Sequence, residues 1–224
     1  MRIRAFSPKS DPEHGPFLMK QLIAMQQIWH VMLAVALFGA ATAAHATTNH
    51  GLRAIHAVTS ARHSDVEHMS RDGLAAALKA DADTGDILIL DVREAHEYAV
   101  SHIPGALRIS PEITATHFQQ KFANKLKGRQ VVLYCSVGVR STKLASRIRK
   151  SALESGAKSV ANLTGGIFGW HNEGRRLQNA DGSTELVHPY NSFWSTLIER
   201  DALISFGAEP TNSAPSGTSG PANP

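Results

Sequence analysis

The chain has 224 residues, of which 42% are hydrophobic, and its 23 Lys and Arg residues exceed the 19 Asp and Glu residues by four. So small an excess, without a long basic run, gives no reason to expect a nucleic-acid partner, and the hydrophobic share is ordinary for a soluble domain. The single cysteine, Cys135, excludes an internal disulfide.

The amino-terminal segment is predicted to be a secretory signal covering residues 1–46, with Met19 as its start. Residues 21–44 contain no Asp, Glu, Lys or Arg, and Ala44 and Ala46 supply small residues before the expected cleavage point. An uncleaved anchor is the alternative, but the densest apolar part has only about 11 residues, which is short for a bilayer span. We therefore expect a periplasmic or secreted protein with no stable membrane association after cleavage.

Two further segments are expected to lack a packed structure. Residues 47–67 are predicted to be a linker, and residues 207–224, rich in Pro, Ser, Gly, Thr and Asn, a disordered tail. Histidines in and beside the linker raise the question of a metal site: His50, His56, His63 and His68. Their spacing matches no ligand motif, so no metal is expected.

Between these ends, short apolar runs alternate with helical patterns. The expected strands are 87–90, 106–109, 131–134 and 160–163. The expected helices are 70–79, a short one through Tyr98, 114–126, 141–153, and a short one after Gly165-Gly166. This alternation predicts an α/β fold with an open parallel sheet and helices on both faces.

The segment Val131–Ser141 carries the candidate chemistry. Its first four residues are typical of a strand buried on both faces, and Cys135 stands at the carboxyl end, the edge where ligands bind in such sheets. A loop containing Gly138 and the start of a helix can direct backbone N–H groups and the positive end of the helix dipole at an anion. With Arg140 beside it, Cys135 has the surroundings of a nucleophilic thiolate rather than of a structural cysteine.

The order of four motifs resembles that of single-domain rhodaneses, the thiosulfate sulfurtransferase-like proteins, in a secreted form. The motifs are Asp91-Val92-Arg93, Tyr98-x3-His102-Ile103-Pro104-Gly105-Ala106-x2-Ile109, Cys135-Ser136-Val137-Gly138-Val139-Arg140-Ser141 and Gly165-Gly166-x3-Trp170. The resemblance covers residues 68–178 and implies the rhodanese-like fold with a persulfide on the catalytic residue Cys135. It also implies a substrate-binding loop made of Ser136, Val137, Gly138, Val139, Arg140 and Ser141.

The resemblance implies a sulfurtransferase that needs no cofactor. Sulfane sulfur moves from thiosulfate or a related donor to an acceptor such as cyanide or a thiol. One alternative is a periplasmic sulfur-carrier or redox module that binds a protein partner and turns over little thiosulfate. A phosphatase or arsenate reductase is a weaker alternative, because those enzymes place one residue more between cysteine and arginine than the four found between Cys135 and Arg140.

Other residues receive supporting roles. We expect Asp91 and Arg93 to hold loops near the site by pairing with each other or with Glu97, and His102 to be structural. Trp170 is assigned to the core. Residues 179–206 are predicted to be a carboxyl-terminal extension with a helix, in which Phe193 and Trp194 are a candidate docking surface.

Overall fold

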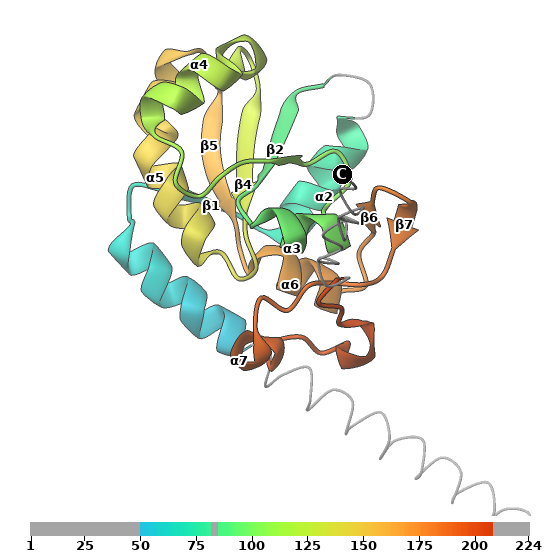
Figure 1. Cartoon of the computed structure of the whole chain (residues 1–224). Coiled ribbons are helices and arrows are strands. Elements are labelled where there is room, and N and C mark those ends of the chain that lie inside the picture. The colour runs from blue at the N-terminus through green and yellow to red at the C-terminus, as the bar shows by residue number, and fades with distance from the viewer. Residues whose placement is uncertain (1–49, 82–84, 208–224) are drawn as a thin grey trace, which may run out of the picture. The chain divides into compact units, whose positions relative to one another are not determined.

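The computed structural model describes residues 50–81 and 85–207 (Figure 1). All of these belong to one compact unit, Thr47–Pro224. The predicted signal and its start at Met19 lie outside the described residues, as does the predicted tail beyond Gly207. No described helix is long and apolar enough to cross a bilayer.

Five parallel strands of the described chain form a sheet in the order β1-β5-β4-β2-β3. They are β1 Glu67–Met69, β2 Ile87–Asp91, β3 Leu107–Arg108, β4 Gln130–Tyr134 and β5 Ser159–Leu163. Strand β4 is central, and its residues from Val131 to Tyr134 are completely buried. A strand covered on both faces needs apolar residues at successive positions, which explains why its sequence does not alternate. The predicted parallel α/β fold is confirmed.

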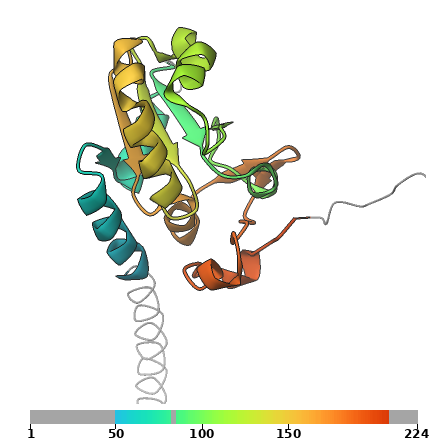
Figure 2. The same cartoon turned by 60° about the vertical axis from the view of Figure 1, so that its left-hand side comes forward.

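Helices cover both faces of the sheet (Figures 1 and 2). They are α2 Arg71–Ala80, α3 Ala95–Val100, α4 Ala115–Leu126, α5 Val139–Glu154, α6 Gly166–Asn172 and α7 Ser192–Ser195, with a 3-10 turn at Asp201–Leu203. Along β4, Val131 and Leu133 pack in one apolar cluster with residues of α4 and α5. The intervening Val132 and Tyr134 pack on the other face with residues of α2 and α6.

A helix over residues 50–62 replaces much of the linker predicted for 47–67, so that prediction was wrong. Leu52 is only 3% exposed and joins the same apolar cluster as α6, with Ile55 packed against it. Leu52, Ile55 and Thr59 lie three and four residues apart, on one helical face. The prediction gave weight to the histidines and overlooked this apolar spacing.

The carboxyl-terminal extension contains less helix than expected. Strands β6 Leu177–Asn179 and β7 Gly182–Thr184 form an antiparallel hairpin, and α7 is a single turn. Tyr190 has a left-handed φ of 68°, and Pro189 precedes it. These two residues prevent α7 from extending further toward the amino terminus. The buried side chain of Val187 fastens this segment to the core, and its backbone bonds to Leu203 and Ser205.

Candidate active site

Cys135 begins the loop between β4 and α5 and is 1% exposed. Its Sγ accepts a hydrogen bond from the backbone N–H of Gly138 at 3.2 Å. Gly138 has φ +102°, and a Cβ there would lie 3.2 Å from Nδ2 of Asn162, so the tight curl needs glycine. Helix α5 starts immediately afterwards at Val139, two residues before the expected Ser141. The first-turn N–H groups of α5 therefore belong to the loop around the sulfur.

Helix α6 holds the carbonyl groups of this loop. Ile167 N donates to Cys135 O at 2.9 Å, and Phe168 N donates to Ser136 O at 3.0 Å. Gly166 allows this approach, because a Cβ on it would lie 2.3 Å from Cys135 O. With these carbonyl groups engaged by α6, backbone N–H groups remain to face negative charge at the sulfur. This contact gives the Gly165-Gly166 motif its role.

Two hydroxyl groups hold the start of α5. Ser141 Oγ donates to Asn162 Oδ1 of β5 at 2.6 Å, and Thr142 Oγ1 donates to Gly138 O at 2.7 Å. Both side chains are completely buried. The side chain of Ser141, a residue predicted to bind substrate, thus connects the start of α5 to β5 through Asn162.

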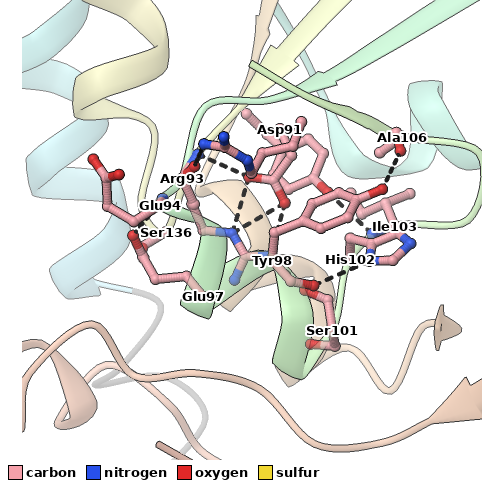
Figure 3. Close-up of polar contacts among 12 residues, drawn as sticks. Asp91, Arg93, Glu94, Glu97, Tyr98, Ser101, His102, Ile103, Ala106 and Ser136 are labelled. Atoms are coloured by element: carbon pink, nitrogen blue, oxygen red, sulfur yellow. Dashed lines mark hydrogen bonds and ion pairs between the residues drawn. The ribbon is translucent and has the colours of Figure 1, made fainter. Parts of the chain in front are cut away.

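A buried carboxylate lies beside the loop. Both oxygens of Glu97 accept from Arg140 at 2.9 Å, and Ser136 Oγ donates to Glu97 Oε1 at 3.1 Å. Figure 3 shows Glu97 beneath Ser136. Glu97 also accepts from the backbone N–H of Glu94, in a capping box at the start of α3. One side chain therefore ties α3 to both ends of the Cys135–Arg140 loop.

The pairing of Glu97 with Arg140 keeps both groups charged. Burial alone would raise the pKa of Glu97, but the hydrogen bonds and charge of Arg140 outweigh it and hold that pKa below its usual range. Burial likewise opposes the charge on Arg140, while Glu97 raises the pKa of the guanidinium. From the sequence, Glu97 was expected at most to pair with Asp91 or Arg93; in the structure it is the ion-pair partner of Arg140. The capping-box spacing Glu94-x-x-Glu97 was the available signal.

Asp91 and Arg93 form the pair that the sequence predicted. Arg93 Nη2 lies 2.7 Å from Asp91 Oδ2, and both side chains are 0% exposed. The same Nη2 donates to the carbonyl oxygen of Ser101, so the pair joins the end of β2 to the end of α3 (Figure 3). It fixes the helix that carries Glu97.

His102 has the structural surroundings expected for it. Its ring stacks on that of Tyr98 with the centroids 3.8 Å apart, and its Nδ1 lies 3.1 Å from Tyr98 O. Tyr98 in turn donates from its hydroxyl group to Ala106 O at 2.7 Å (Figure 3). Trp170, at 4% exposure, is a core residue as expected.

A cavity of about 160 Å³ opens onto the sulfur. Its lining residues are Cys135, Ser136, Val137, Val139, Arg140, Tyr190 and Trp194. The last two come from the carboxyl-terminal extension, and the Tyr190 ring lies 4.7 Å from the Arg140 guanidinium carbon. Tyr190 was not among the predicted site residues. Over residues 50–81 and 85–207, no cluster of three or more His, Cys, Asp or Glu is arranged to hold a metal ion.

Part of the chain is similar in sequence to known proteins. The family model for the rhodanese-like domain matches residues 74–173. A sulfurtransferase from Allochromatium vinosum is 32% identical over 101 residues, which cover 45% of this chain and 87% of that protein. The chain belongs to the rhodanese-like family. Its rhodanese-like domain contains Cys135, Glu97 and Arg140, whereas Tyr190, Trp194 and the helix over 50–62 lie outside the matched range.

Two longer proteins are also similar to part of this chain. A tRNA uridine(34) hydroxylase from Cytophaga hutchinsonii is 33% identical over 114 residues, which cover 47% of this chain and 35% of that protein. A solved thiosulfate sulfurtransferase from Pseudomonas aeruginosa has a TM-score of 0.43 and 22% identity, with 63% of this chain and 25% of that one covered. The chain thus spans about a third or less of these two relatives.

Proposed function

We propose that the protein transfers sulfane sulfur through a persulfide on Cys135, with thiosulfate or a related sulfane compound as the donor. The observation that carries this proposal is the contact of Cys135 Sγ with the N–H of Gly138, at the end of β4 and the start of α5. Four residues separate Cys135 from Arg140, a short loop that suits a single sulfur atom. Membership of the rhodanese-like family supports the same chemistry.

The transfer has two balanced steps. The Cys135 thiolate attacks the outer sulfur of thiosulfate, the S–S bond of the donor breaks, and its electron pair leaves on sulfite. An acceptor such as cyanide then attacks the terminal sulfur of the persulfide, thiocyanate leaves, and the electron pair returns to Cys135. Backbone N–H groups of the loop stabilise the anionic sulfur in both steps. Because the positive charge of Arg140 is paired with the carboxylate of Glu97, the loop amides carry most of this stabilisation.

The test is turnover of thiosulfate and cyanide by the parent protein, followed as thiocyanate release. Mass spectrometry after thiosulfate treatment should show a gain of about 32 Da, one sulfur atom, on Cys135. Cys135→Ser should abolish both signals. A parent protein that hydrolyses aryl phosphates and takes no sulfur from any sulfane donor would overturn the proposal.

A second candidate function is a periplasmic sulfur carrier that serves a protein partner and turns over little thiosulfate. The exposed aromatic residues near the cavity favour it: Tyr190 is 45% exposed and Phe193 is 75% exposed. A stable persulfide on Cys135 combined with slow cyanide turnover would select this function over the first.

A further inference from the structure

A second cavity, of about 520 Å³, adjoins the first and shares Val139 and Trp194 with it. Its other lining residues are Ala54, Ile55, Val58, Thr59, Arg62, His63 and Lys143. We name the two cavities together the acceptor groove; its lining residues come from the Cys135–Arg140 loop, α5, the helix over 50–62 and the carboxyl-terminal extension. Its far wall lies outside the matched rhodanese-like domain.

The rim of the acceptor groove is apolar and exposed. Val58 is 53% exposed, Val139 43% and Tyr190 45%, and all three line the groove. Phe193, at 75% exposure, contacts Trp194 edge to face with their ring centroids 5.4 Å apart. Exposed apolar residues gathered around a reactive group are typical of a surface that binds a polypeptide.

The charge of the groove specifies the partner further. Arg62 and Lys143 are both exposed, and neither makes an ion pair or a side-chain hydrogen bond with any residue in the described part of the chain. His63 lies beside them, and no acidic residue of that part lines the groove. Unpaired cations beside an apolar surface complement a segment with both apolar and acidic side chains.

We infer that the sulfur acceptor is a cysteine in a partner polypeptide, flanked by apolar and acidic residues that lie in the acceptor groove. This inference rests on the proposed function. The partner's thiol loses its proton to solvent, and its thiolate attacks the terminal sulfur of the Cys135 persulfide. The bond from Cys135 Sγ to that sulfur breaks, its electron pair stays on Cys135, and the partner leaves with the persulfide.

The test is single-turnover discharge of the persulfidated full chain, followed as loss of the added sulfur mass. The probes are an acetylated peptide with cysteine between two leucines followed by two glutamates, the same peptide with lysines for the glutamates, glutathione, and cyanide as the reference acceptor. We expect the acidic peptide to discharge Cys135 about tenfold faster than the basic one, with a preference that weakens as salt is added.

Charge reversal supplies the decisive comparison. In Arg62→Glu/Lys143→Glu the preference should invert, so that the basic peptide becomes faster relative to cyanide, a gain that misfolding cannot produce. The matched control is Arg53→Glu/Lys150→Glu, which changes exposed residues on the same two helices that do not line the groove and should keep the parental preference.

Two results would overturn the inference while leaving the proposed function intact. One is equal discharge by both peptides in every variant; the other is discharge by glutathione as fast as by the acidic peptide and insensitive to charge reversal. Failure of Cys135 to take up sulfur from any sulfane donor would instead refute the proposed function.

Discussion

At Glu97, burial and charge act in opposite directions, and Arg140 decides the outcome. Glu97→Gln should lower the free energy of unfolding by about 2–4 kcal/mol, somewhat below the range for breaking a fully buried pair, because Arg140 is 25% exposed. It should also slow sulfur transfer, since the loop loses its tie to α3. Urea unfolding and thiocyanate release measure the two effects.

The control for this variant is Glu154→Gln, which removes an exposed partner of Lys150 and should change stability by less than about 0.5 kcal/mol.

The dependence of stability on acid pH is an independent test of the same pair. The pKa of Glu97 is lower in the folded state, so its contribution to stability is complete above its unfolded value of about 4.3 and is lost as pH falls through the folded value. Glu97→Gln should remove this acid-dependent part of the stability. If the variant loses as much stability at low pH as the parent does, other carboxylates cause the loss.

On the scale of elements, the contact between α6 and the loop leaves no room for a side chain at Gly166. Gly166→Ala places a methyl group 2.3 Å from Cys135 O, so the loop or the helix must move. We expect sulfur transfer to be nearly lost, with a decrease in stability beyond the cost of a left-handed alanine, about 1–2 kcal/mol. Thiocyanate release and urea unfolding of the variant give both values.

Gly174→Ala separates steric overlap from backbone strain. Gly174 has φ +65°, close to the +56° of Gly166, but the nearest atom to a Cβ there, apart from its chain neighbours, would be Nη1 of Arg200 at 3.8 Å. This variant should lose about 1–2 kcal/mol and keep its sulfur transfer. Equal activity in the two variants would mean that α6 does not hold the loop.

For the whole molecule, histidines that are wholly or partly buried set the response to mild acid. Burial lowers the pKa of four of them: His56, His68, His171 and His188. Their unfolded value is about 6.5, so the unfolded chain binds more protons just below that pH and stability must fall as pH decreases. Urea midpoints should therefore be lower at about pH 5 than at about pH 7.5. A midpoint that rises in acid would contradict these pKa directions.

Processing is also a property of the whole chain. We predict that the mature protein begins at Thr47 and is exported, because Ala44 and Ala46 satisfy a signal peptidase. Cleavage there coincides with the start of the compact unit Thr47–Pro224 and would leave the helix over 50–62 intact. Amino-terminal sequencing of the exported protein is the measurement, with Ala44→Phe as a variant expected to block cleavage. A membrane-bound chain that retains Met19 would establish an anchor instead.

The sequence by itself determined the features that depend on neighbouring residues. Apolar runs identified β2, β4 and β5, because a strand buried on both faces has no polar position to interrupt it. Gly138 marked the loop after Cys135, and Gly165-Gly166 marked the turn into the short helix α6, since left-handed backbone is read from local residue type. The order of motifs was enough to indicate the family.

Only the tertiary structure decided which distant residues meet. Glu97 and Arg140 lie 43 positions apart, and either had other partners of opposite charge available in the sequence. Tyr190 and Trp194 complete the cavity although their segment carries no family motif. The helix over 50–62 is held by the burial of Leu52 against residues far along the chain. Pairing and burial are settled by the packing of the folded chain, and local pattern contains no information on which surface a segment will cover.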